Sequence, residues 1–217
     1  HIIKKIVDIR YSFMPALYNA AHLTSLGLDT IIKPLWFVYE SDEKSYNIDD
    51  QYMVGNNILV SPILSKNTNQ RLTYLPNNKT GWVNYFNNKF ITFGETIIDN
   101  LELDQVGIYI SNKSILPTTN PNYVDTDYFD FVYFNIYAFN YKNNDSIELV
   151  YYDDDGNSFD FEEGKFIKLR IKYVDERIIL SNLNNNEIFN KKIKKYKFNL
   201  INENGLKEIK KIEIEGI

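Results

Sequence analysis

The sequence predicts a mixed fold, with an α/β segment at the N-terminus and an all-β region after it. Apolar residues recur at helical spacing from Ile2 to Ala21. A continuous apolar run, Ile31–Tyr39, is typical of a strand buried on both faces, as parallel strands under helices are. From Ile58 onward, short β-prone runs alternate with turns rich in Asn, Gly and Pro, and the chain holds 17 Tyr and 14 Phe, which favour strands.

Two residues set the expected shape of the N-terminal helical segment. Pro15 interrupts the helical pattern, so we expect a kink or two abutting helices rather than one straight helix. Gly27 stands where a helix would end on a left-handed residue. The segment therefore predicts helix, buried strand and short helix, which is the end of an α/β unit.

The remainder is expected to form two antiparallel β modules, with a boundary near residues 118–127, where Pro117 and Pro121 flank polar residues. The expected strands are Ile58–Leu64, Arg71–Leu75, Trp82–Tyr85, Ile97–Leu103, Val106–Ile110, Phe129–Ala138, Ile147–Tyr152, Ser158–Phe161 and Lys165–Tyr173.

Composition excludes several function classes. A net charge of −5 gives no electrostatic reason to expect nucleic-acid binding. The chain has no cysteine, which excludes disulfides, cysteine nucleophiles and cysteine-based zinc sites. No apolar run approaches the roughly 20 residues that span a bilayer. Because the sequence has no initiator Met and His1 directly precedes a helical pattern, we expect a fragment of a longer protein.

An ordered series of motifs resembles glycoside hydrolase family 31. The most specific is residues 47–52 (N-I-D-D-Q-Y), followed by Gly55 and by residues 59–62 (L-V-S-P). The others are 10–18 (R-Y-S-F-M-P-A-L-Y), 33–36 (K-P-L-W), 72–76 (L-T-Y-L-P) with 81–83 (G-W-V), 115–117 (I-L-P) and 152–159 (Y-D-D-D-G-N-S-F). Within the family, these motif sequences are most similar to those of the glucosidase II branch. The family commonly has Arg at position 33 and an Arg-Gly-Gly turn at residues 112–114, so this sequence departs from it at both places.

The resemblance implies a fold and a domain division. Residues 1–57 would be the last helix–strand–helix of a (β/α)8 barrel, incomplete in this chain. Residues 58–120 would be a proximal β-sandwich module, and residues 121–217 a distal one.

The resemblance also implies an activity. The parent would be a retaining α-glucosidase that removes terminal α-linked glucose from N-glycan oligosaccharides in the endoplasmic reticulum lumen, with a non-catalytic β subunit and no cofactor. Retaining glycosidases use two carboxylates; the family's two aspartates lie upstream in Trp-x-Asp-Met-Asn and Gly-Asp motifs that do not occur here. We therefore assign no catalytic, cofactor-binding or metal-binding residue, and expect the chain alone to be inactive.

Two acidic clusters have alternative interpretations. Asp49 and Asp50 could be a catalytic pair, but adjacent acids that open a short helix ending at Gly55 are the simpler interpretation. Residues 153–157 (D-D-D-G-N) could bind calcium. An EF-hand frame that starts at Asp153 lacks the required Gly and Glu, so a hairpin turn is favoured.

Other residues have a structural interpretation beside a functional one. Trp36 and Phe37 could stack on a sugar, although core packing is the default, and Trp82 is expected in a core. His22 is expected on a helix face without metal ligands. The lysine-rich run 191–195 could bind an anion, but a guarded strand edge is favoured.

Three N-x-S/T triplets occur, beginning at Asn78, Asn112 and Asn144, and they weakly favour the secretory route. Two alternatives to the glucosidase II interpretation stay open. One is a non-catalytic β-sandwich module that binds carbohydrate or protein. The other is another family 31 enzyme, such as an α-xylosidase.

Overall fold

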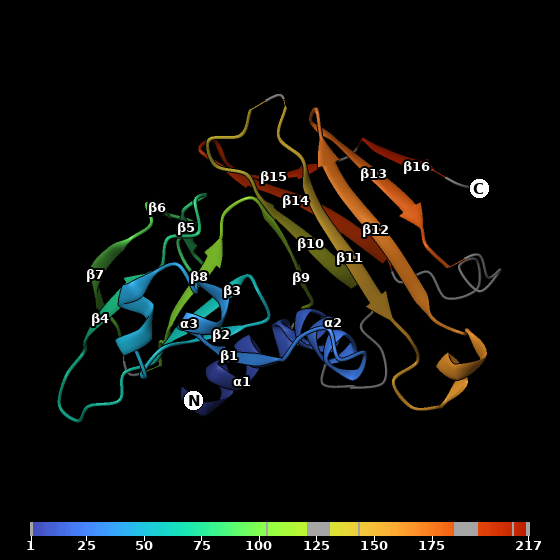
Figure 1. Ribbon diagram of the computed structural model, residues 1–217. Helices are drawn as coiled ribbons and strands as arrows, with labels where there is room; N and C mark the ends of the chain where they lie inside the picture. The colour runs from blue at the N-terminus through green and yellow to red at the C-terminus, as the bar shows by residue number, and fades with distance from the viewer. Residues whose placement is uncertain are drawn as a thin grey trace. The chain divides into compact units, whose positions relative to one another are not determined.

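The computed structural model describes residues 2–102, 104–120, 131–142, 144–184, 195–209 and 211–215, and it is mostly β-sheet with few helices (Figure 1). The described chain forms two compact units. Unit 1 comprises His1–Asp8 and Leu23–Asn112, and unit 2 comprises Ile9–His22 and Lys113–Ile217. A β-rich chain with a helical N-terminal segment was predicted, and this coarse fold class is confirmed.

The helices and strands follow one another in this order: α1 Ile2–Ser12, α2 Met14–Ser25, β1 Ile32–Pro34, α3 Leu35–Val38, a 3-10 helix η1 Glu43–Asn47, β2 Tyr52–Val54, β3 Ile58–Ser61, β4 Gln70–Leu75, β5 Trp82–Asn84, β6 Phe90–Ile91, β7 Glu95–Asn100, β8 Gly107–Ser111, β9 Ser114–Thr118, β10 Phe131–Tyr137, β11 Ile147–Asp153, a 3-10 helix η2 Asp160–Glu163, β12 Ile167–Val174, β13 Arg177–Asn182, β14 Lys195–Asn202, β15 Gly205–Ile209 and β16 Ile212–Glu215.

The N-terminal segment is two abutting helices, as Pro15 predicted. α1 ends at Ser12 and α2 begins at Met14, so the proline lies in the first turn of α2, where its missing N–H costs little. Gly27 has a φ of +70°. Its N–H donates to the Thr24 carbonyl (2.9 Å), and the next N–H donates to the Leu23 carbonyl (3.0 Å), which is the Schellman ending that the glycine predicted.

Unit 1 contains a six-stranded sheet of order β1-β2-β3-β8-β5-β6 and the two-stranded sheet β4-β7. All the strand pairs described in these two sheets are antiparallel. The core cluster of this unit consists of Leu35, Met53, Leu59, Leu75, Trp82 and Tyr109, each with no exposed surface. Trp82, predicted to be a core residue, donates from Nε1 to the Pro76 carbonyl (2.9 Å).

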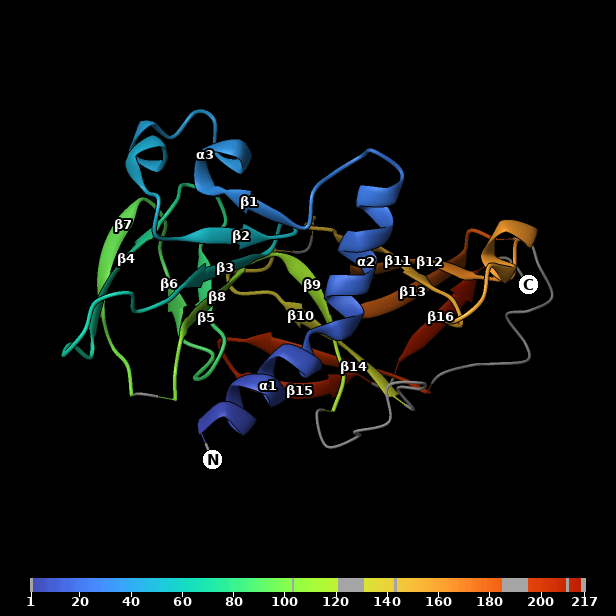
Figure 2. The same ribbon diagram turned by 90° about the horizontal axis from the view of Figure 1, so that it is seen from below.

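The predicted buried strand Ile31–Tyr39 is wrong. Only Ile32–Pro34 is a strand, at the edge of the six-stranded sheet and antiparallel to β2. At Leu35 the backbone turns into α3, which lies close to β1 and β2 (Figure 2). The physical reason is Pro34, which has no N–H for a continuing ladder and whose fixed φ suits the residue before a helix.

The short helix that Asp49 and Asp50 were predicted to open, ending at Gly55, is also wrong. The helical turn η1 ends at Asn47, so Asp49 and Asp50 follow a helix rather than open one. Gly55 is not a helix stop: with a φ of +56° it begins the three-residue turn between β2 and β3. A glycine in the left-handed region is common in such hairpins.

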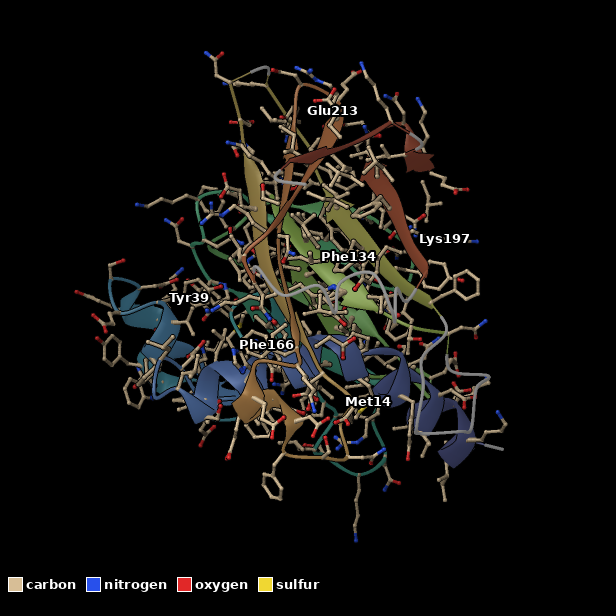
Figure 3. The ribbon with its side chains drawn as sticks, turned by 90° about the vertical axis from the view of Figure 1, so that its right-hand side faces the viewer. Met14, Tyr39, Phe134, Phe166, Lys197 and Glu213 are labelled. Carbon is tan, nitrogen blue, oxygen red and sulfur yellow. The ribbon has the colours of Figure 1, made fainter. Side chains whose placement is uncertain are left out.

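Unit 2 is built from two four-stranded sheets, β15-β14-β10-β9 and β11-β12-β13-β16. Its buried core takes residues from both sheets, and Figure 3 shows Phe134 among them in the interior. Two pairs, β10 with β14 and β13 with β16, are parallel. The prediction of a purely antiparallel second module is therefore wrong, because strands from the C-terminal end insert beside earlier strands.

Most of the other predicted strands are present within two or three residues of their expected bounds. The exception is Ser158–Phe161, where the structure has the 3-10 helix η2. Residues 153–157 do not form a tight hairpin turn, because β11 continues to Asp153 and the connection to β12 spans residues 154–166. Strands β2, β6, β9 and β13 to β16 were not predicted.

Predictions on His1, Leu103, residues 121–130 and Lys191–Lys194 lie outside the described residues. The division into domains 1–57, 58–120 and 121–217 stays a prediction, as does the barrel origin of residues 1–57. Among the described residues, no helix is long and apolar enough to cross a membrane.

Candidate functional site

The motif residues of unit 1 form a polar network that fixes a loop to a sheet. We define the anchor loop as residues 39–51, between α3 and β2. Gln51 is 4% exposed. Its Nε2 donates to the Tyr74 carbonyl and its Oε1 accepts the Tyr74 N–H, both at 2.8 Å. The side-chain amide thus pairs with the β4 backbone as a neighbouring strand would.

Asp42, in the same loop, provides a second attachment to Tyr74. Its carboxylate accepts the Tyr74 hydroxyl at 2.7 Å and the Asn77 N–H at 3.0 Å. Burial, followed by the hydrogen bond to Asp42, raises the pKa of Tyr74. The hydroxyl therefore stays protonated and donates throughout the physiological range.

The third attachment is an ion pair between Asp50 and Arg71. Arg71 Nη1 lies 2.5 Å from Asp50 Oδ2, and Nη2 donates to the Asp50 carbonyl at 3.0 Å. The hydrogen bond from Arg71 is the largest cause of a lowered Asp50 pKa. Asp50 is therefore an ionised, structurally engaged carboxylate, and Asp49 does not share this ion pair. This arrangement does not favour a catalytic Asp49–Asp50 pair.

The network continues into the sheet interior through hydroxyl groups. Arg71 Nε donates to Ser61 Oγ at 2.8 Å, and the Thr73 hydroxyl contacts Ser61 Oγ at 2.9 Å and Asp99 Oδ2 at 2.8 Å. The Tyr109 hydroxyl bonds to the other oxygen of Asp99. A Cβ at Gly107 would lie 2.9 Å from the Ser61 carbonyl, so only glycine allows this approach.

Lys33, which stands where the family commonly has arginine, is also structural. Its side chain is 2% exposed, and its Nζ lies 2.5 Å from Asp29 Oδ1 and 2.5 Å from Asn56 Oδ1. Burial acts to raise the pKa of Asp29, but the bonds from Lys33, Thr30 and Asn56 outweigh it, so the pKa is lowered. The lysine therefore replaces the arginine as a buried cation.

In unit 2, the acidic motif 153–157 anchors α2 to β11. Asp154 accepts hydrogen bonds from the hydroxyls of Tyr18 and Tyr152, the second at 2.7 Å. Asn19 Oδ1 accepts the Tyr152 N–H at 2.8 Å. The His22 ring stacks on Tyr152, with centroids 3.5 Å apart and planes 1° apart. Burial lowers the pKa of His22, which keeps the stacked ring neutral at pH 7.

Hydrogen bonds within the protein occupy the carboxylates of this motif. Asp155 accepts the N–H groups of Asn157 and Ser158 and the Ser158 hydroxyl, and Asp154 also accepts the Gly156 N–H. Among the described residues, no group of three His, Cys, Asp or Glu side chains could hold a metal ion. The carboxylates of Asp154 and Asp155 therefore have a structural role in the connection between β11 and β12.

Exposed aromatic side chains gather on α3 and η1. Trp36 is 43% exposed, Phe37 51% and Tyr46 55%. The Trp36 and Tyr46 rings stack with a centroid distance of 6.4 Å and an interplanar angle of 17°. Core packing was the default expectation for Trp36 and Phe37, and within the described residues it is wrong.

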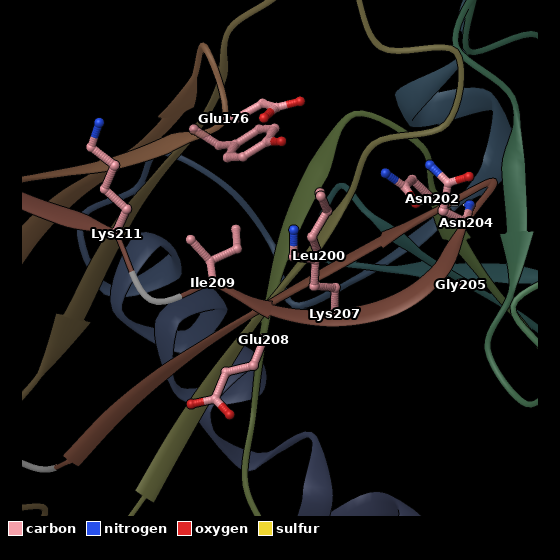
Figure 4. A pocket seen from close by; sticks show the side chains of 10 residues that line it. Glu176, Leu200, Asn202, Asn204, Gly205, Lys207, Glu208, Ile209 and Lys211 are labelled. Carbon is pink, nitrogen blue, oxygen red and sulfur yellow. Dashed lines mark hydrogen bonds between the residues drawn. The ribbon is translucent and has the colours of Figure 1, made fainter.

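A pocket of 630 Å³ lies in unit 2 between the β12–β13 turn and the β14–β15 hairpin (Figure 4). It is lined by Tyr173, Glu176, Leu200, Asn202, Asn204, Gly205, Lys207, Glu208, Ile209 and Lys211. Burial raises the pKa of Tyr173 to about 12, so its phenol is neutral. This mixture of amide, charged and aromatic groups suits a polar ligand. The sequence analysis did not identify it, because β14 and β15 were not predicted.

Comparison with known proteins defines the class. Residues 28–116 match a family model described as "Glycosyl hydrolase family 31 C-terminal domain". "Alpha-glucosidase 2" of Bacillus thermoamyloliquefaciens is 30% identical over 174 residues, which are 79% of this chain and 21% of that protein. "Alpha-xylosidase" of Saccharolobus solfataricus is 29% identical over 178 residues, which are 81% of this chain and 23% of that protein.

A solved structure supports the fold. In the crystal structure of an ER glucosidase II heterodimeric complex, the matched chain superposes on 89% of this chain with a TM-score of 0.78 and 22% identity, and 22% of that chain is covered. The class is thus the C-terminal β-rich part of a glycoside hydrolase. The chain contains the C-terminal domain of glycoside hydrolase family 31, which residues 28–116 match. It spans 21% and 23% of the length of the two curated relatives.

Proposed function

We propose that this chain is the C-terminal part of a retaining α-glucosidase that resembles glucosidase II, and that its role is mechanical. The observation that supports the proposal is the anchor loop, because its family motif residues Asp50 and Gln51 make hydrogen bonds that attach the loop to β4. The two catalytic aspartates would belong to polypeptide that precedes this chain. The parent would hydrolyse terminal α-linked glucose from N-glycan oligosaccharides.

The mechanical role requires surfaces that contact the rest of the enzyme. Ile3 is 77% exposed on α1 and Phe37 51% exposed on α3. Apolar side chains that are exposed in a group commonly mark an interface. We propose that these residues belong to the last part of the barrel, residues 1–57, and that they pack against earlier barrel elements. Limited proteolysis of the full-length protein should cut near residues 58 and 121 if the proposed domain division holds.

The test of activity compares the full-length protein with the isolated chain. Both are assayed on an aryl α-glucoside and on a glucosylated N-glycan, with circular dichroism as the control for folding. We expect activity in the full-length protein only. Turnover by the isolated chain would contradict the proposal for this chain, and an inactive but folded full-length protein would contradict the enzymatic claim. An aryl α-xyloside in the same assay distinguishes an α-xylosidase, which the relative from Saccharolobus solfataricus favours.

We further propose the endoplasmic reticulum lumen as the location and a non-catalytic β subunit as the partner. The support is the fold shared with the catalytic subunit of the ER glucosidase II complex, which was solved with the binding domain of its regulatory subunit. Subcellular fractionation and co-purification from native cells test both claims. A cytosolic protein that purifies alone would contradict them.

One observation favours the alternative, a carbohydrate-binding module. The lining of the unit 2 pocket includes Asn202, Asn204 and Tyr173, and amide and aromatic groups of this kind can orient a polar ligand. Calorimetric titration of the full-length protein with malto-oligosaccharides, repeated with Asn202→Ala, tests it. Binding that the substitution abolishes without loss of hydrolysis would support the alternative, and equal binding by both proteins would contradict it.

A further inference from the structure

The three N-x-S/T triplets have different structural environments. The first begins at Asn78, whose side chain closes a turn before β5. Its Oδ1 accepts the N–H groups of Thr80 (3.1 Å) and Gly81 (2.7 Å), while its Nδ2 donates to the Gly81 carbonyl (2.8 Å) and to Ser111 Oγ (3.1 Å). Both ends of the amide are therefore occupied, and a sugar that replaces one Nδ2 hydrogen would leave one of the two acceptors without its donor.

The second triplet begins at Asn112 and is built into the same turn. Asn112 is 2% exposed. Its Nδ2 donates to the Thr80 carbonyl (2.9 Å), and the Thr80 hydroxyl donates to the Asn112 carbonyl (2.9 Å). Thr80 is also the third residue of the Asn78 triplet. The two triplets thus interlock, and a glycan at either asparagine would prevent this cluster from closing.

The third triplet, residues 144–146, lies in the connection between β10 and β11 and differs from the other two. Asn144 and Ser146 are exposed. The central Asp145 is held on several sides: its carboxylate accepts Lys113 Nζ and the Lys142 N–H, both at 2.8 Å, and its carbonyl accepts the Tyr141 hydroxyl at 2.6 Å. Because this central residue is fixed, the exposed Asn144 side chain lies at the surface, and no hydrogen bond within the described residues engages it.

We propose that Asn144 is an N-glycosylation site and that Asn78 and Asn112 are not, an inference that rests on the proposed location in the endoplasmic reticulum. The donor is an oligosaccharide linked to a lipid diphosphate. The Asn144 side-chain nitrogen forms a bond to the anomeric carbon of the first sugar, its proton passes to solvent, and the lipid diphosphate leaves. Unit 2 can fold around the product, because the glycan extends from an exposed side chain.

The experiment uses the full-length protein expressed in its own cells. Peptide N-glycosidase treatment in heavy-oxygen water marks each formerly occupied asparagine, and mass spectrometry of peptides gives the occupancy at all three positions. We expect Asn144 to be marked and Asn78 and Asn112 to be unmarked. Asn144→Gln and Ser146→Ala should each remove one glycan from the intact protein. Ser146→Thr, which keeps the hydroxyl, should retain it.

Protease protection in sealed microsomes separates the two ways in which the experiment can fail. A protein that is protected in the lumen but bare at Asn144 overturns the glycosylation inference alone. A protein that is not protected overturns the proposed location, and the inference falls with it. Marked Asn78 or Asn112 in folded, active protein overturns the argument from the interlocked turn.

Discussion

Replacing Gln51 by leucine tests whether the anchor loop is held by its side-chain amide. The substitution keeps the approximate size of the side chain but leaves the N–H and the carbonyl of Tyr74 without the partners that now lie at 2.8 Å. Each buried polar group that loses its partner costs about 1–3 kcal/mol, and the added apolar surface offsets part of this, so we expect a loss of about 3 kcal/mol.

A loss of this size is measurable by calorimetry and by urea unfolding. For a domain of this size, about 3 kcal/mol corresponds to a decrease in Tm of about 6–12 °C. Gln70→Leu is the matched control, because Gln70 is an exposed residue of β4 whose amide donates to the exposed Asn100 side chain at 3.3 Å. We expect that control to change stability by less than about 0.5 kcal/mol. Equal effects of the two substitutions would refute the proposed role of Gln51.

Gln51→Glu adds a pH dependence. A carboxyl buried at this position has a folded-state pKa above its unfolded value, because burial disfavours the charged form. Below the unfolded pKa, the neutral carboxyl can still donate to the Tyr74 carbonyl. As the pH rises through the folded-state pKa, this stabilisation is lost, so the variant should be closer to wild type at pH 4 than at pH 7. A destabilisation independent of pH would show that the amide site is not buried in solution.

Three further predictions follow from the same contacts. Gly81→Ala should lower the free energy of unfolding, measured in urea, by about 2–4 kcal/mol, because Gly81 has a φ of +92° and a Cβ there would lie 2.5 Å from the Phe90 ring. Gly94→Ala is the control: Gly94 has a φ of +73° but open space around it, so the loss should be only about 1 kcal/mol. Equal losses would contradict the steric argument. Tyr18→Phe removes one of the two tyrosine hydroxyls on Asp154 and should lower stability by about 1 kcal/mol in the same assay, and an unchanged midpoint would contradict the anchoring of α2. The pKa of Asp50 is lowered in the folded state, so its ionised form stabilises the fold above the unfolded-state pKa of about 4, and this stabilisation is lost as the pH falls through the folded-state pKa. Asp50→Asn should therefore make the free energy of unfolding less dependent on pH in the acid range. An unchanged pH dependence would refute the proposed ion pair.

Local signals predicted the elements that local chemistry determines. Pro15 and Gly27 marked a helix junction and a helix end, because each restricts or permits a backbone conformation whatever the surroundings. Short β-prone runs between turn-prone residues predicted the early strands of both units, because these signals also lie within each segment. Pro34 carries a comparable signal against a strand through Tyr39, because a proline inside a run cannot donate to the ladder, whereas the apolar composition of the run does not by itself distinguish a strand from a short helix.

The rest depends on contacts between residues distant in sequence. Gln51 was recognised as part of a motif, but its partner is the backbone of Tyr74, and a backbone acceptor leaves no mark in the sequence. Asp50 was placed in a helix because acids are common there, whereas its partner Arg71 lies 21 residues later. The family resemblance identified the motif residues in this segment, and the structure identified their hydrogen-bond and ion-pair partners.

The parallel pairing of β10 with β14 has a consequence for synthesis of the protein. Residues 131–137 pair with residues 195–201, so β10 has an unpaired edge until the later segment has left the ribosome. An open, apolar strand edge is a template for association with other chains. Unit 1 contains only antiparallel pairs in its described sheets. The pair with the largest sequence separation among them is β3 with β8, and both of these strands lie within residues 58–111. A nascent chain should therefore complete unit 1 early and need chaperone protection chiefly while β10 waits for its neighbour.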